Sequence, residues 1–171
     1  MPAQPVPSPG DNFNRLVEIM ALLRGPGGCP WDREQSLDTL KRYLLEETYE
    51  VLEAISDGDP RKLTEELGDL LLQVVFHAEL ARESGKFDIT DVVEGIHDKM
   101  VRRHPHVFGD VAARTPSQVV KNWEQIKAAE KRSKTHAADW ETRKVPSVLD
   151  GIPRNLPALL RVFHARSRVA A

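Results

Sequence analysis

Two groups of acidic side chains have a spacing that could build a metal site. The first contains Glu46, Glu47 and Glu50, and the second contains Glu66 and Asp69. A separation of three residues places two helical side chains on one face. Carboxylates brought together away from water repel one another and lose hydration, at a cost of several kcal/mol each. Mg²⁺, with Mn²⁺ as a substitute, prefers oxygen ligands and would remove both penalties.

The phase of these acids favours a metal site over an ordinary solvated surface. At about 100° per residue, Glu47 falls inside the apolar stripe of its helix. In the next helix, Glu66, Asp69 and Gln73 form a polar wedge between two apolar sides. A helical hairpin would join the two faces at a half-buried site, with the expected metal ligands Glu47, Glu50, Glu66 and Asp69. For Glu53 and Glu65, which lie off the shared face, the solvated interpretation stays preferred.

Composition excludes several classes of function. The 171 residues include 24 Lys and Arg and 26 Asp and Glu, and the resulting charge of −2 gives no general attraction to nucleic acid or to an anionic membrane. The single cysteine, Cys29, excludes an intrachain disulfide and suits a reducing compartment. No apolar run reaches the roughly 18 residues of a membrane span, and the first residues lack the pattern of a signal peptide. We therefore expect a soluble cytoplasmic protein.

The periodicity of apolar residues predicts an all-α fold, a helical bundle with four main helices per protomer. Helices are expected near residues 12–24, 34–57, 60–84, 88–103, 115–131 and 156–168. No segment has the alternation of a strand. The predicted organisation is a disordered Pro-rich start (1–11), an all-α domain (12–132), a linker (133–147) and a C-terminal helical tail (148–171).

The helix at 60–84 is apolar on two sides, which predicts that helices pack against both of them. Leu72 and Phe76 face nearly opposite to the other apolar residues of this helix. Since one protomer covers one side well, the pattern predicts a homodimer, with a higher oligomer as an alternative, and with Leu72 and Phe76 at the interface.

Five segments, taken in order, resemble the MazG family of nucleoside triphosphate pyrophosphohydrolases. They are GGCPWDREQSLDTL (27–40), LLEETYEVLEAI (44–55), ELGDLLLQVVFHA (66–78), KMVRRHPHVFGD (99–110) and WEQIKAAEK (123–131). The resemblance covers residues 12–132 and continues weakly to 165. Each segment alone is a weak signal, whereas all five in order are highly specific. A further segment, 147–161, is similar to the one that leads into a second domain in two-domain members.

The resemblance implies an all-α fold, tight dimers, Mg²⁺ dependence, and hydrolysis of NTPs or dNTPs to the monophosphate and pyrophosphate. Housecleaning of the nucleotide pool is the role that we expect. Glu47, Glu50, Glu66 and Asp69 match the family's metal ligands. Around the nucleotide, the matching positions are Lys99, Arg103 and Trp123.

The chemistry of single residues adds further hypotheses. A metal-activated water would attack the α–β linkage of the triphosphate, and Glu46, which adjoins the ligands, would be the general base. A plain surface role fits Glu46 equally well. Lys99 and Arg103, four residues apart, would bind the outer phosphates, although favourable charge at a helix end is the simpler alternative. Trp31 and Trp123 are candidates for base stacking, with a core role as the alternative, and Lys127 could reach a phosphate or remain surface.

Two other classes of protein compete with this interpretation. A ferritin-like di-iron bundle needs two Glu-x-x-His elements, whereas this sequence offers Glu94 and His97 on a helix apart from the acidic groups. A non-catalytic helical dimer that binds nucleotides or a protein is the second alternative. Detection of pyrophosphate release separates it from an enzyme.

Overall fold

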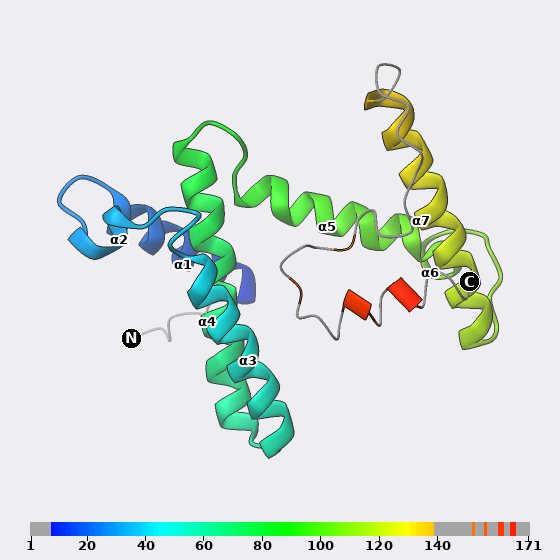
Figure 1. Cartoon of the computed structure of the whole chain (residues 1–171), viewed down its shortest axis with the longest axis horizontal. Helices are drawn as coiled ribbons and strands as arrows, with labels where there is room; N and C mark the ends of the chain where they lie inside the picture. Colours follow the sequence, from blue (N-terminus) through cyan, green and yellow to red (C-terminus); the bar gives the residue numbers. More distant parts are fainter. Residues whose placement is uncertain (1–7, 139–151, 153–155, 157–160, 163–164, 167–171) are drawn as a thin grey trace, which may run out of the picture. The chain divides into compact units, whose positions relative to one another are not determined.

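The computed structural model describes residues 8–138 and, beyond them, residues 152, 156, 161–162 and 165–166. This part of the chain forms seven helices and contains no strand, which confirms the all-α class (Figure 1). The helices are α1 (Pro9–Arg24), α2 (Pro30–Glu34), α3 (Lys41–Asp57), α4 (Pro60–Glu83), α5 (Ile89–Arg103), α6 (Pro105–Phe108) and α7 (Pro116–Ala138).

The chain divides into two compact units, Met1–Arg102 and Arg103–Ala171. The first unit contains α1 to α4 and all but the last residue of α5. The second unit begins with that residue, Arg103, and contains α6 and α7. None of the described helices is long and apolar enough to cross a lipid bilayer.

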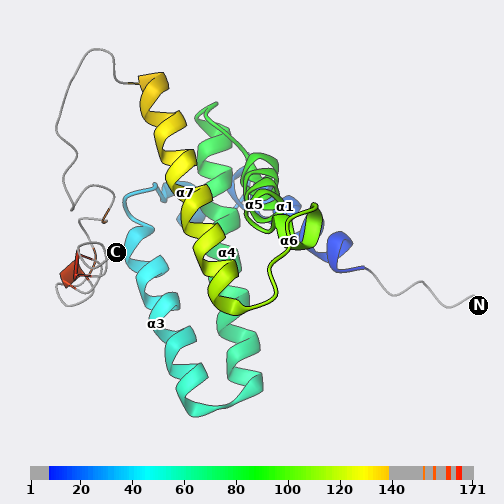
Figure 2. The same cartoon turned by 90° about the vertical axis from the view of Figure 1, so that its right-hand side faces the viewer.

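The first unit is organised around the α3–α4 hairpin, whose two helices lie side by side (Figure 2). α3 ends at Gly58, which adopts a positive φ of 67° that side-chain-bearing residues rarely tolerate. The Asp59 carboxylate then accepts hydrogen bonds from the backbone N–H groups of Arg61 and Lys62, and Pro60 occupies the first helical position. This short turn reverses the chain, so that the acidic segments of α3 and α4 face each other.

α1 packs against α4 and closes the core of the first unit. The buried cluster consists of Met20, Leu40, Val75, Phe76 and Leu80, with Leu72 packed against it. Phe76 is 3% exposed within one protomer. The prediction that Leu72 and Phe76 face a partner is therefore wrong, because α1 already covers that side of α4.

The opposite side of α4 is the uncovered one. Leu67, Leu71 and Val74 recur at helical spacing and are 48%, 41% and 38% exposed. The side with Leu72 and Phe76 carries fewer apolar residues than the opposite side, yet it is the one that α1 covers, and periodicity within α4 alone could not show this.

Several helix ends differ from the sequence-based expectation. α1 begins at Pro9, three residues early, because Ser8 and Asp11 form a reciprocal capping box. α3 begins at Lys41 and not near Glu34, because the short α2 and a turn precede it. α7 continues to Ala138, into the range expected as linker. The rest of that linker and most of the C-terminal helical tail lie outside the described residues.

A tight loop joins α1 to α2 and carries Trp31. The backbone N–H of Cys29 donates a 2.7 Å hydrogen bond to the Leu23 carbonyl, which folds the loop onto the end of α1. At Gly28 a Cβ atom would lie only 2.2 Å from the Leu23 carbonyl oxygen, so this close approach requires glycine. The glycines of this segment therefore fix where Trp31 is presented.

Candidate functional site

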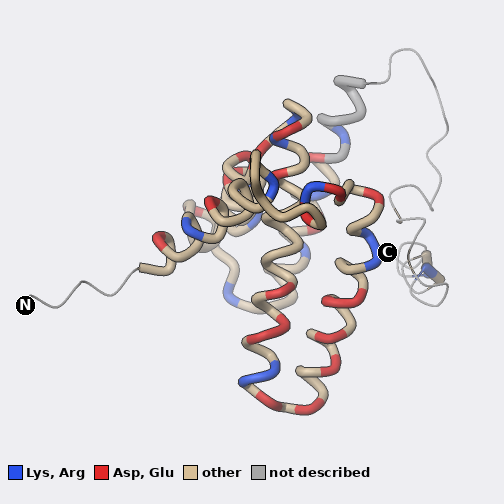
Figure 3. The backbone as a smooth tube through the Cα atoms, turned by 90° about the vertical axis from the view of Figure 1, so that its left-hand side faces the viewer, with Lys and Arg blue, Asp and Glu red and all other residues tan. Residues whose placement is uncertain are grey.

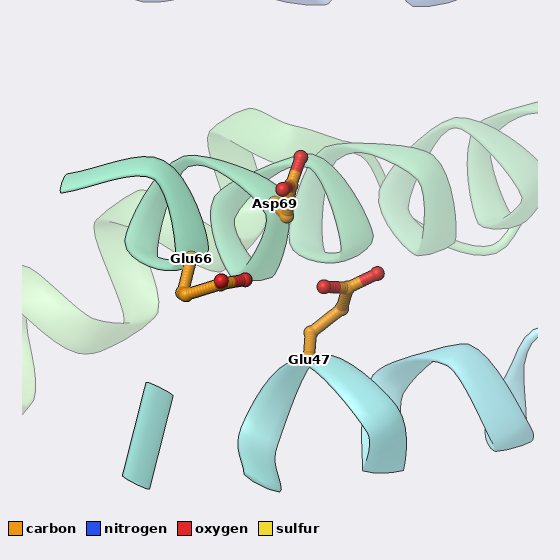
Figure 4. Close-up of side chains that lie close together, drawn as sticks. All are labelled: Glu47, Glu66 and Asp69. Atoms are coloured by element: carbon orange, nitrogen blue, oxygen red, sulfur yellow. The ribbon is translucent and has the colours of Figure 1, made fainter. Parts of the chain in front are cut away.

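Three carboxylates meet between α3 and α4. Glu47 reaches across from α3 toward Glu66 and Asp69 on α4 (Figure 4). One oxygen from each side chain can be chosen so that all three lie within 4.8 Å of one another. The hairpin thus brings together residues that are about twenty positions apart, as the sequence predicted for these three.

The electrostatics of this cluster are unfavourable for ionised acids. Burial is the largest cause that raises the pKa of Glu47 above its ordinary value, followed by the charge of Asp69 and by Glu50 and Glu66. Burial also raises the pKa of Glu66, with the charges of Glu50, Glu65 and Asp69 adding to it. Glu47 and Glu66 therefore lose part of their preference for the charged form, because of burial first and of the neighbouring acids second.

No basic side chain among the described residues forms an ion pair with Glu47, Glu66 or Asp69. Lys62, the nearest candidate on α4, bonds instead to Glu53 at 2.8 Å and Asp57 at 3.0 Å. Red segments accordingly gather along both facing helices in Figure 3. The charge of Lys62 lowers the pKa of Glu66, but it is the smallest of the causes that act on this carboxyl. A cluster of oxygen donors that forms no ion pair with a base among the described residues fits a divalent cation of the Mg²⁺ or Mn²⁺ type.

The remaining acids of the first group have different positions. Glu50 is exposed, and it is one of the neighbours that raise the pKa of Glu47, after burial and the charge of Asp69. It is not one of the three side chains whose oxygens converge. Glu46, the expected general base, is also exposed and lies outside this cluster.

Gln73 is the unusual polar residue of this helix face. It lies one helical turn beyond Asp69, and its side chain is only 6% exposed. Its Oε1 atom is buried and has no hydrogen-bond partner among the described residues. Buried carboxamide oxygens normally accept a hydrogen bond. The described residues do not supply a hydrogen-bond donor to this atom.

Trp31 lies at the surface of the first unit and is 49% exposed. It packs edge-to-face on Tyr43, with ring centroids 5.7 Å apart. The exposed part of the Trp31 ring is available to stack on a ligand, and the contact with Tyr43 shows that the residue also packs against the protein.

Arg24 holds the segment that carries Trp31, and the sequence analysis missed it. Its guanidinium, 7% exposed, donates two 2.7 Å hydrogen bonds to the Glu83 carboxylate and reaches the Asp32 carbonyl. It also lies over the ring of Phe76. An arginine at a helix C-terminus is too common to signal such a role, and its partner is 59 residues away.

Three residues expected near the nucleotide group together in the second unit. Arg103 lies 5.9 Å from the centre of the Trp123 ring, and the Lys127 ammonium lies 5.2 Å from the same point. Arg103 is also paired with Glu130 at 2.6 Å, and Lys127 with Glu124 at 2.9 Å. Lys99 is a partly buried residue of α5 in the first unit.

Comparison with known proteins agrees with this geometry. Residues 35–108 match the family described as the MazG nucleotide pyrophosphohydrolase domain, a range that contains all three converging carboxylates. The chain is 49% identical to the nucleoside triphosphate pyrophosphohydrolase of Escherichia coli K12, over 94% of this chain and 58% of that protein. It is 54% identical to the nucleoside triphosphate pyrophosphohydrolase/pyrophosphatase MazG of Thermotoga maritima, over 71% of this chain and 46% of that protein.

A solved structure supports the same relationship. The crystal structure of a mazG-related protein from Thermotoga maritima superposes with a TM-score of 0.57 at 30% identity, covering 67% of this chain and 98% of that one. The chain spans a little over half the length of the Escherichia coli relative. The family match, the sequence identity and the shared helical fold agree, and this chain belongs to the MazG family.

Proposed function

We propose that this chain hydrolyses nucleoside triphosphates to the monophosphate and pyrophosphate in a reaction that depends on Mg²⁺. The observation that supports this proposal most directly is the convergence of oxygen atoms of Glu47, Glu66 and Asp69 within 4.8 Å, with no ion pair to a base in the part of the chain that the structure describes. The name of the Escherichia coli relative, nucleoside triphosphate pyrophosphohydrolase, supports the choice of substrate class. Housecleaning of the nucleotide pool in the cytoplasm is the biological role that we attach to it.

In this proposal Glu47, Glu66 and Asp69 hold the cation, and Glu50 contributes from the edge of the cluster. When bound, a divalent cation would neutralise phosphate charge and lower the pKa of a coordinated water. The hairpin fixes the carboxylates before the substrate arrives, so that little reorganisation is needed at the moment of reaction. Glu46, exposed beside this cluster, accepts the proton of the attacking water.

Nucleotide contacts are assigned to the basic and aromatic residues. Trp123 offers a ring face for the base, and the cations of Arg103 and Lys127 already lie near that ring. Arg103 must exchange its pairing with Glu130 for a phosphate in order to bind one. Lys99 on α5 and the half-exposed Trp31 complete the proposed set of substrate-binding residues.

We further propose a homodimer formed by the uncovered side of α4, which replaces the Leu72 and Phe76 interface expected from the sequence. Leu67, Leu71 and Val74 form an exposed apolar row on that side. Exposed apolar rows of this kind are typical of surfaces that a second chain covers.

The purified 171-residue chain should release pyrophosphate from NTPs or dNTPs when Mg²⁺ is present, and the release should stop when EDTA is added. Glu47→Gln should lower this rate at least about 100-fold, since it removes a ligand and a charge from the cluster. Glu18→Gln, on the exposed side of α1, is the matched control. Nucleotide binding without any pyrophosphate release would instead support the non-catalytic alternative.

A further inference from the structure

We propose that Gln73 is an additional residue of the cation site, where its carboxamide oxygen accepts a hydrogen bond from a water that the cation holds. This inference rests on the proposed function, because it requires a divalent cation at Glu47, Glu66 and Asp69. It adds a neutral residue, deeper in the protein than the acids, to a site that the sequence motif describes by carboxylates alone.

The position of Gln73 on α4 is the first argument. It follows Asp69 by four residues and Glu66 by seven, so all three lie on one face of the helix. Helical side chains lean toward the helix N-terminus and cover the preceding turn. The Gln73 side chain therefore leans over the turn that contains Asp69.

The unsatisfied hydrogen-bonding capacity of Gln73 is the second argument, and it is independent of the acidic cluster. The residue is 6% exposed, and its Oε1 has no partner among the described residues. Its backbone carbonyl, by contrast, is satisfied by the His77 ring at 2.6 Å. An orphaned buried acceptor destabilises a fold, so a methionine or leucine would suit this position better unless a ligand supplies the missing donor.

The chemistry of the expected cation identifies that donor. Mg²⁺ keeps several of its waters when it binds through a few carboxylates, and each coordinated water has protons that need acceptors. A neutral carboxamide oxygen accepts such a proton without adding another negative charge to acids whose repulsion is already uncompensated. Gln73 thereby orients the hydrated ion from its buried side.

Binding of Mn²⁺ to the full chain without nucleotide tests this proposal separately from catalysis. Titration is followed by the loss of the electron paramagnetic resonance signal of free Mn²⁺. Gln73→Met, which keeps the volume and removes the acceptor, should weaken Mn²⁺ binding about 10–100-fold. Gln73→Glu, which keeps the shape and an acceptor oxygen, should retain binding. Gln125→Met makes the same chemical change at an exposed position and should bind as the unmodified chain does.

Thermal unfolding of the same proteins supplies a second measurement. Without metal, Gln73→Met should melt about 3 °C higher than the unmodified chain, since the orphaned acceptor is gone. With saturating Mn²⁺ this advantage should shrink or reverse. If Gln73→Met fails to fold, Gln73→Leu provides the same two readouts.

Four results would overturn the inference. The first result is that Gln73→Met binds Mn²⁺ as tightly as the unmodified chain and melts at a higher temperature at every Mn²⁺ concentration. Gln73 Oε1 would then accept its hydrogen bond from an ordinary buried water. The second result is an unchanged Mn²⁺ affinity with a raised KM for nucleotide, which would mean that Gln73 Oε1 contacts the substrate. If the unmodified chain binds no Mn²⁺, the metal site itself fails. By contrast, loss of binding in Glu47→Gln but not in Gln73→Met rejects the role of Gln73 alone.

Discussion

At the scale of single residues, the candidate site consists of acids whose ionised form is destabilised by their surroundings. Burial and neighbouring charges both raise the pKa of Glu47, and the same two effects raise the pKa of Glu66. Such strain in the metal-free protein is the expected counterpart of an ion that relieves it. Substitutions within the cluster should therefore have opposite effects on stability and on ion binding.

Glu47→Gln should raise the melting temperature of the metal-free protein by about 2–4 °C, because it removes a partly buried charge that has no basic partner. The same substitution should abolish the further rise that Mg²⁺ causes in the unmodified chain. Differential scanning calorimetry with EDTA and with about 10 mM Mg²⁺ measures both effects. A lower melting temperature in EDTA would mean that the carboxylate is stabilising by itself.

Glu46→Gln tests the proposed proton acceptor. It should lower kcat for pyrophosphate release by about 100-fold or more while KM stays within roughly threefold, because the residue is exposed and lies outside the ion-binding group. Steady-state kinetics give the two constants separately. An unchanged kcat would remove Glu46 from the mechanism and leave it a surface acid.

At the scale of elements, one local turn and one contact between residues distant in the sequence position the site. The α3–α4 turn brings the acids together, and the Arg24–Glu83 pair ties the end of α1 to the end of α4. Arg24 also contacts the Asp32 carbonyl, so the loop that carries Trp31 is held to the same point. Loss of this pair should loosen α1 and the loop together.

The Arg24–Glu83 pair predicts a specific dependence of stability on pH. Hydrogen bonding to Arg24 lowers the pKa of Glu83 below its ordinary 4.5. Its stabilising effect should therefore be complete above about pH 5 and be lost as the pH falls through the lowered folded pKa. Glu83→Gln should lower the unfolding free energy by about 1 kcal/mol at pH 7, a value reduced for solvent screening because the Glu83 side chain is 35% exposed, and by much less near pH 3.

Urea denaturation at the two pH values measures this difference. Asp38→Asn is the matched control, since both side chains of the Asp38–Lys41 pair are exposed and solvent screens their attraction, so its loss should leave the unfolding free energy nearly unchanged. An equal cost of Glu83→Gln at both pH values would mean that charge on Glu83 is irrelevant and that only its packing matters.

At the scale of the whole molecule, the open question of assembly depends on which side of α4 remains uncovered. α1 occupies the side with Phe76, which leaves Leu67, Leu71 and Val74 exposed. The proposed dimer interface follows from this choice, and so does the variant that should break it.

Leu71→Glu should convert the proposed dimer into a monomer at micromolar concentration, because it places a charge in the centre of the exposed apolar row. Sedimentation velocity distinguishes the two species. Leu22→Glu, at an exposed position of α1, should leave the assembly intact. A monomer before any substitution would refute the dimer.

Comparison of sequence and structure separates local from tertiary determinants. The sequence predicted the helices around the acids, the hairpin turn and the meeting of Glu47 with Glu66 and Asp69, because helix periodicity and capping are local properties. It misplaced the start of α3, where a short helix and a turn interrupt a pattern that looked continuous.

The sequence by itself determined which acids can share one face, since that depends only on spacing along two adjacent helices. Only the tertiary structure decided which apolar side of α4 is buried, how Arg24 joins α1 to Glu83, and that the buried Oε1 of Gln73 has no hydrogen-bond partner among the described residues. Each of these depends on how helices distant in the sequence pack together. The free energy of such packing is set by complementary shape and charge across space, which no local pattern encodes.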